Sequence, residues 1–450
     1  MSNSLHLKRA IQKVFPRENN GLLLYLFSAH FIMLSNILYL VVLHKSVLPI
    51  ALQGPVTSPL IRAAHSFAYA IFLAFCSQGT NPQNSFSRTK KGIQIGVAGA
   101  FVLVILSTIS PSISSIGVIG EYILPLLFFC ALIFGAYGDA MATPALLGII
   151  ASTGEKKGPK YVGYFWISIS FSYIYAPLLA NHFLSLIKQD QFFRIFPFAF
   201  DLLLSLSALV IFPVAFSRLE KAKPPIQPPK ARTSNKKAVA STVFTDLFKI
   251  LISEKPLRIC VLILAANQFA FNSLKTASQE LSRPWNHLGL TGNAIMFFIT
   301  SLLVAMWWKK SKNTEEKTRT IVLTSLWMIL AVGFLVIVLN KSPTTGAGIM
   351  LLFGPFSAIL YTGINIYYTQ FLILKGESKL GARLGMFSSL YRFFGSIGYL
   401  VTALISMVHV HIASQLPEPI LAFLINSLPV MLVILYFTRA TKKTIGGNNV

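Results

Sequence analysis

Long uninterrupted runs of apolar residues constrain this chain more than any other feature of its sequence. Each run is close to the ~20 residues that an α-helix needs to cross the hydrocarbon core of a bilayer. In lipid, a spanning segment must satisfy its own backbone polar groups, and these continuous runs differ from the short alternating segments of a membrane barrel. The sequence therefore predicts an all-α polytopic membrane protein.

Twelve such runs are separated by charged residues, proline or glycine. A composition of 54% hydrophobic and 12% charged residues agrees with this class, because a water-soluble enzyme of 450 residues carries more charge. The fourth, tenth and eleventh runs exceed one perpendicular crossing, which predicts tilted or protruding helices, and the short eighth run suits a broken helix. The predicted spans are residues 21–43, 58–78, 92–110, 122–150, 161–187, 192–216, 257–275, 291–308, 319–339, 347–374, 381–408 and 418–438.

Lysine and arginine are concentrated in alternate loops, as in membrane proteins whose cytoplasmic loops are basic. With a cytoplasmic N-terminus, most of the 39 Lys and Arg residues fall on the inner side. This predicts a multi-pass protein with both termini in the cytoplasm, in the inner membrane of a bacterium, since the loops are compact. The net charge of +25 then faces membrane lipid and requires no nucleic acid. The outer side holds Lys45, Lys188, Arg194, Lys275, Arg283 and Lys341.

The middle of the chain separates two sets of six spans. Residues 217–237 read SRLEKAKPPIQPPKARTSNKK, a composition typical of an extended, solvated linker. Phrases recur at offsets of about 220 residues: GPKYVG at Gly158 matches GARLG at Gly381, and FGAYG at Phe134 matches FGPFS at Phe353. We predict an N-terminal six-helix bundle (1–216), a basic Pro/Lys-rich cytoplasmic linker (217–255) and a C-terminal six-helix bundle (256–450).

Together these features resemble the major facilitator superfamily (MFS) of secondary transporters over nearly the whole chain. In that family the fourth span carries small residues and a proline before a basic loop and a glycine-led fifth span, here Gly135, Gly138, Pro144, Lys160 and Gly163. HLGLTGNAIMFFI is similar to the start of the family's eighth span. The resemblance implies twelve transmembrane helices in two pseudo-symmetric six-helix bundles (MFS-like).

The loop between the second and third spans departs from the family's signature, G-x-x-x-D-R-x-G-R. Here it reads QGTNPQNSFSRTKKG, in which Arg88, Lys90 and Lys91 supply cations while Ser87 replaces the acidic residue. Ala131 stands near the position where the family carries an arginine in the fourth span. The chain is identified as a divergent member, and these departures put in question the charge relay that usually latches the halves.

Polar and ionisable residues at membrane depth mark candidate functional residues, because each is costly to place in lipid. Two polar stripes at helical spacing predict a wet central cavity, although tyrosines and serines that hydrogen-bond between packed helices fit the same pattern. Arg62 also suits the membrane interface, and Asp139 also suits a simple ion pair. The predicted substrate-binding residues are Arg392, Tyr361, Asn365, Tyr368, Ser396, Tyr399 and Arg62, and the predicted proton-coupling residues are Asp201, Asp139 and His30.

The sequence thus predicts a monomeric secondary active transporter that moves a small polar, anionic organic solute by alternating access, coupled to protons or another ion, without metal or cofactor. An enzyme is not expected, because no HExxH motif and no glycine-rich phosphate loop occurs. An exporter of lipophilic compounds or siderophores is an alternative that 36 Phe residues would suit, and a nontransporting receptor of the same fold is another. The solute, the coupling ion and the direction of transport stay open.

Overall fold

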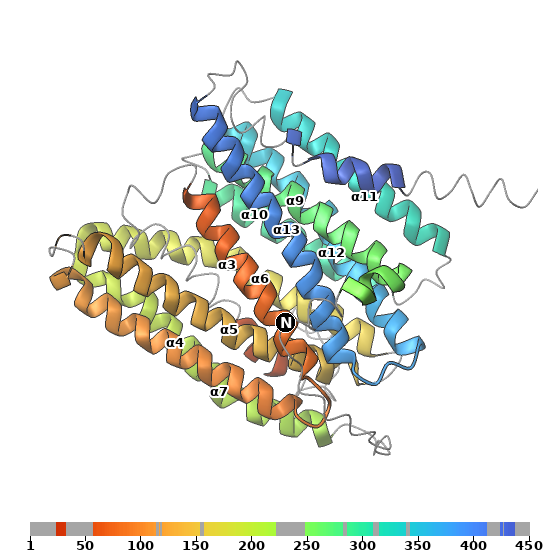
Figure 1. Ribbon diagram of the computed structural model, residues 1–450, viewed down its shortest axis with the longest axis horizontal. Coiled ribbons are helices and arrows are strands. Elements are labelled where there is room, and N and C mark those ends of the chain that lie inside the picture. Colours follow the sequence, from red (N-terminus) through yellow and green to blue (C-terminus); the bar gives the residue numbers. More distant parts are fainter. Residues whose placement is uncertain are drawn as a thin grey trace, which may run out of the picture.

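The structure is a computed structural model, and the residues that it describes form helices and the turns between them, with no strand among them (Figure 1). It describes residues 24–32, 57–113, 117, 119–153, 157–221, 248–281, 286–308, 315–338, 343–411, 424–425 and 427–436.

The N-terminal half contributes a helical segment at residues 24–32 and five longer helices. A π-helical turn, Ile119–Ile123, precedes α5, and a short 3-10 turn, Gln191–Arg194, precedes α7. The Asp190 carboxylate accepts a hydrogen bond from the Phe192 backbone N–H at 2.9 Å, which caps that turn. The longer helices are α3 (Thr57–Gln78), α4 (Ser85–Ile113), α5 (Leu124–Ala151), α6 (Gly158–Gln189) and α7 (Ile195–Lys221).

The C-terminal half repeats this plan with five long helices and a helical segment at residues 427–436. Pro355 lies inside α12, as Pro144 lies inside α5, and both helices continue through the proline. The long helices are α9 (Lys255–Leu281), α10 (Asn286–Trp308), α11 (Glu315–Val338), α12 (Pro343–Leu374) and α13 (Leu380–His411).

The predicted second to eleventh spans each correspond to one of these helices. Several helices are longer than predicted, because the prediction ended each span at its charged residues; α4, for example, begins at Ser85 and includes Arg88 in its first turn. The eighth span is one continuous helix, α10, and not a broken one. Parts of the first and last predicted spans lie outside the described residues, so the count of twelve stays a prediction.

Among the described residues, five helices are long and apolar enough to cross a membrane, and all five are in the N-terminal half. Shorter apolar helices occur at Thr291–Trp307, Thr320–Leu335 and Ser427–Tyr436. Large apolar side chains such as Val210, Leu203 and Leu432 are exposed, which suits surfaces that face lipid.

The two halves form two groups of helices with their contact in the middle of the molecule (Figure 1). The α3 helix packs along α13, and α6 packs against α10 and α12, so each half offers helices to the other. The repeat of about 220 residues relates α3 to α10 and α6 to α13, so the α3–α13 contact corresponds to the α10–α6 contact. Side chains at the centre of the molecule can therefore come from both halves.

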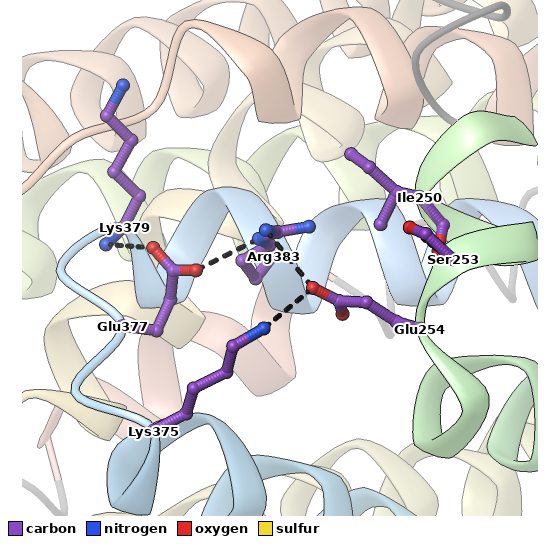
Figure 2. A network of polar contacts seen from close by, with 7 residues as sticks. All are labelled: Ile250, Ser253, Glu254, Lys375, Glu377, Lys379 and Arg383. Atoms are coloured by element: carbon purple, nitrogen blue, oxygen red, sulfur yellow. Dashed lines mark hydrogen bonds and ion pairs between the residues drawn. The ribbon is translucent and has the colours of Figure 1, made fainter.

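One end of the bundle, where α12 ends and α13 begins, carries Lys375, Lys379 and Arg383, and we call it the basic end. The end of α5 and the start of α13 meet there, as do the loop after α12 and the start of α9. Figure 2 shows a network of ion pairs at this end. The Glu254 carboxylate accepts a hydrogen bond from Lys375 Nζ at 3.0 Å and lies 3.4 Å from the Arg383 guanidinium. The Nε of Arg383 donates a hydrogen bond to the Glu377 carboxylate at 3.0 Å.

This network ties the last residue before α9 to the loop between α12 and α13. Glu254→Gln is expected to lower the free energy of unfolding by about 1 kcal/mol, because the charge that Lys375 and Arg383 share is lost while Arg383 keeps Glu377. Thermal unfolding in detergent at low and high salt measures the change. Lys379→Ala is the matched control, since Lys379 joins the network through its backbone N–H only, and an equal loss there would contradict the assignment.

Candidate functional site

Arg392 lies on α13 between the two halves and forms the centre of the candidate site. Its guanidinium stacks over the Tyr69 ring of α3, with 4.9 Å between Cζ and the ring centroid. A cation over the face of an aromatic ring is attracted by the ring's negative face, by about 2 kcal/mol where water is excluded. A cation of the C-terminal half is thus held by an aromatic side chain of the N-terminal half.

Further tyrosines surround this arginine. The Tyr361 hydroxyl of α12 and the Tyr391 hydroxyl of α13 hydrogen-bond to each other at 2.7 Å, and Trp166 of α6 packs edge-on against Tyr361 at 5.2 Å. Tyr361, Tyr391, Tyr69 and Tyr173 all lie within electrostatic range of Arg392. We call Arg392, Tyr69, Asp139, Tyr173, Tyr361 and Tyr391 the Arg392 cluster.

Asp139 of α5 supplies the negative charge of the cluster. It is 4% exposed, its carboxylate accepts a hydrogen bond from the Thr143 hydroxyl at 3.0 Å, and the Tyr69 hydroxyl lies within hydrogen-bonding reach. Asp139 is also within electrostatic range of Arg392. Tyr69 therefore interacts with both a carboxyl group of the N-terminal half and a guanidinium of the C-terminal half.

Three buried polar atoms in this region have no hydrogen-bond partner among the described residues. They are Arg392 Nε, Trp166 Nε1 and Nε2 of His65, which is 8% exposed and lies one helical turn before Tyr69. Tyr173 keeps 45% of its surface exposed although it interacts with Arg392 and Asp139. An arginine with an unsatisfied Nε is suited to receive an anionic group.

His30 lies in the helical segment 24–32 and is held by α6. Its Nδ1 hydrogen-bonds with the Ser168 carbonyl and the Ser172 hydroxyl, each at 2.8 Å, and its Nε2 with the Tyr175 hydroxyl. Both ring nitrogens are thus occupied within the N-terminal half, and these contacts favour a structural role for His30.

Asp201 of α7 lies across a small cavity from Asp139. The cavity, of about 20 Å³, is lined by both carboxyl groups, by Ser205 and by glycines of α4 and α5. This volume is enough for about one water molecule. Asp201 therefore shares this cavity with Asp139, which is a member of the Arg392 cluster.

The other predicted substrate-binding residues lie apart from Arg392 or face their own helix. Arg62 and Tyr399 are within electrostatic range of each other, and Tyr399 is also within electrostatic range of Tyr173. The Asn365 amide donates to the Tyr361 carbonyl and the Ser396 hydroxyl to the Arg392 carbonyl, so both are satisfied by their own helices. Tyr368 packs against Phe387, with 4.6 Å between ring centroids.

The halves are in close contact at the basic end. A Cβ on Gly381 of α13 would lie 2.5 Å from the Pro144 carbonyl and 3.0 Å from Gly148 Cα, both on α5. A Cβ on Gly385 would overlap Ser77 of α3 and Pro144. The corresponding glycines of α6, Gly158 and Gly163, lie against Ile373 and Ile366 of α12. The glycines of the two repeated phrases thus occupy matching contacts between the halves.

The divergent signature loop takes no visible part in this closure. Arg88 Nη2 donates to the Cys76 carbonyl at 2.8 Å, which satisfies the end of α3 within the same half. Ser87 is exposed. Contacts through Gly381 and Gly385 thus bring the two halves together at the basic end.

Sequence reasoning did not single out Tyr69, Tyr173, Tyr391 or Trp166 as site residues. The spacing of Arg62, His65 and Tyr69 puts all three on one face of α3, and this shared face is the feature from which Tyr69 could have been predicted. In the part of the chain that the structure describes, no group of three or more His, Cys, Asp or Glu side chains could hold a metal ion.

Comparison with known proteins gives matches of fold only. No protein-family model matches the chain, and no curated protein matches it. The human organic anion transporter MFSD10 (TETRAN) matches at a TM-score of 0.65 and 14% identity, over 94% of this chain and all of that chain. The E. coli fucose:proton symporter FucP matches at 0.55 and 17%, over 93% and 97%. A POT family transporter in complex with a peptide conjugate matches at 0.60 and 10%, over 96% and 99%.

These likenesses cover nearly the whole of each chain and agree with the helix order and the two-half arrangement described above. The chain has the fold of the major facilitator superfamily transporters.

Proposed function

We propose that this protein is a divergent member of the major facilitator superfamily, a secondary active transporter for a small polar organic anion that works by alternating access. The observation that carries the proposal is Arg392, which lies between the halves, is stacked on Tyr69 and has an unsatisfied Nε. A permanent cation at this depth is costly unless it has a partner that is charged or rich in electrons. A transported anion is such a partner.

The chemistry of the cluster favours a carboxylate or phosphate. Arginine presents a planar set of N–H donors that matches these groups, and the tyrosine hydroxyls of Tyr361 and Tyr391 add further hydrogen-bonding groups. The similar human transporter carries organic anions, which agrees with this class.

Protons are the proposed coupling ion. Asp139 lies close enough to Arg392 to compete with a solute for it, and Asp201 faces Asp139 across the small cavity. Protonation of a carboxyl group here would release the arginine for the solute. One similar structure is a proton symporter, which is consistent with this direction of coupling.

Alternating access requires each end of the bundle to open in turn. The glycine contacts close the basic end, which we place in the cytoplasm, and the exposed Tyr173 marks the side from which the cluster is reached. In this proposal the chain works as a monomer in the inner membrane.

A ligand panel tests the proposal. We expect one class of organic acid or phosphorylated metabolite to raise the melting temperature of the detergent-purified protein, because a ligand at 100 times its Kd adds about 2.7 kcal/mol to the folded state. Amino acids, sugars, iron chelators and lipophilic cations complete the panel. Stabilisation by chelators or lipophilic cations alone would favour an exporter, and stabilisation by no compound would favour a nontransporting receptor.

A further inference from the structure

We propose that Tyr69 is the residue that couples the two charged groups of the site, linking protonation of Asp139 to the binding of the solute anion by Arg392. The inference rests on the proposed function, since it assigns the coupling within the same site. Tyr69 would act as a positioning residue, with its ring on one partner and its hydroxyl on the other.

The geometry around Tyr69 gives it contact with both charges. The face of its ring carries the Arg392 guanidinium at 4.9 Å, and its hydroxyl is within hydrogen-bonding reach of Asp139 and of Thr143. The Thr143 hydroxyl in turn donates to Asp139 at 3.0 Å. Tyr69, Asp139 and Thr143 are 6%, 4% and 3% exposed, so little water screens these interactions.

The backbone beside Tyr69 is fixed to the helix that carries Arg392. The Ser389 hydroxyl of α13 donates to the Ala70 carbonyl of α3 at 2.7 Å, and the Phe67 and Phe393 rings meet edge to face at 5.3 Å. The α3 and α13 helices are thus joined on both sides of Tyr69. A change in the ionisation of Asp139 can therefore shift the Tyr69 ring under Arg392 without a large movement of either helix.

Several other charged or titratable groups face the pair. Tyr173 is also within electrostatic range of both charges, but Tyr69 combines ring contact with Arg392 and a hydroxyl within hydrogen-bonding reach of Asp139. Asp139 faces Tyr69, Thr143 and Arg392, with Asp201 across the cavity. Arg392 faces Asp139 and the cluster tyrosines, and His65 of α3 is also within its electrostatic range. Tyr69 lies in contact with both the carboxyl group and the guanidinium.

The sign of the coupling follows from the charges. An ionised Asp139 attracts the guanidinium and accepts a hydrogen bond from the Tyr69 hydroxyl. Both interactions hold the tyrosine ring and Arg392 against the N-terminal half. Protonation removes that attraction, so the positive charge of Arg392 is free for an anion. Proton binding and anion binding then favour each other by the same factor.

Tyr69→Phe separates the two contacts, because phenylalanine keeps the ring under Arg392 and loses the hydroxyl. We would measure the Kd of acetate, lactate and benzoate by calorimetry at pH 5.5 and pH 7.5, with the melting temperature as a check of folding. In the unsubstituted protein we expect at least one of these carboxylates to bind about tenfold more tightly at pH 5.5. In Tyr69→Phe we expect that ratio to fall to about one.

Two further variants make the result specific. Asp139→Asn should bind with the same affinity at both pH values, since its group cannot ionise. Tyr391→Phe removes another hydroxyl from the cluster, the one bonded to Tyr361, and should keep the pH ratio even if the affinity changes.

A full tenfold ratio in folded Tyr69→Phe would overturn the role of Tyr69 and leave the proposed transporter intact. Binding of equal strength at both pH values in the unsubstituted protein would overturn proton coupling, and with it this inference. Failure of all three carboxylates to bind at either pH would count against the anion site itself.

Discussion

Arg392→Ala is expected to abolish transport while the protein still reaches the membrane in normal amounts. Hydrogen bonds to a charged group contribute about 1.5–3 kcal/mol each, so loss of the guanidinium should weaken anion binding by at least about tenfold. Folding should survive, because the tyrosines that surround the arginine keep contacts of their own, such as the Tyr361–Tyr391 bond at 2.7 Å. Uptake into proteoliposomes or cells, normalised to membrane expression, measures the effect.

Two arginine variants sharpen this result. Arg392→Lys retains the charge without the planar set of donors, so we expect an intermediate loss. Arg62→Ala removes an arginine that interacts with Tyr399 and is not a member of the cluster, and it should lower transport less than Arg392→Ala does. Transport at the normal rate in Arg392→Ala would contradict the assignment of the site.

Much of the fold could be predicted from the sequence, because lipid leaves few alternatives to apolar helices. Ten predicted spans match helices, and the glycines of GPKYVG and GARLG occupy matching contacts between the halves. The division into domains at residues 217–255 stays a prediction. Helix ends were misplaced where basic residues continue a helix, as at the start of α4.

The site was predicted less completely, since it depends on which faces of distant helices meet. Arg392 and Asp139 stood out because a charge at membrane depth is unusual. Tyr69 and Tyr391 did not, because a tyrosine within an apolar span looks like any other core residue. His30 also stood out as an ionisable group, and only the structure places Ser168, Ser172 and Tyr175 around it.

Gly381→Ala is the second substitution expected to have a large effect, and it should act on conformation and not on solute binding. The added methyl would lie 2.5 Å from the Pro144 carbonyl and 3.0 Å from Gly148 Cα, and a backbone cannot rotate out of the way as a side chain can. Overpacking of this kind costs about 1–3 kcal/mol. A cost of 2 kcal/mol borne only by the state closed at the basic end would shift the balance of states about thirtyfold.

Access to Ser77 would report this shift directly. Ser77 is fully buried at the contact with Gly385, so a Ser77→Cys variant with the three natural cysteines replaced should resist a water-soluble thiol reagent while the basic end is closed. Adding Gly381→Ala should make that thiol react and should lower net transport by about tenfold or more, because a carrier that rarely closes one end completes few cycles.

Gly348→Ala is the matched control, because a Cβ on Gly348 of α12 would meet no atom of the described residues within 4 Å. It should leave both the thiol reactivity and transport unchanged. If Gly381→Ala left the thiol protected and transport normal, the glycine contact would not be the closure of the basic end. If it lowered transport with the thiol still protected, the basic end would remain closed and the loss would arise elsewhere. Only reactivity and transport changing together would support a gate made by backbone contact through Gly381.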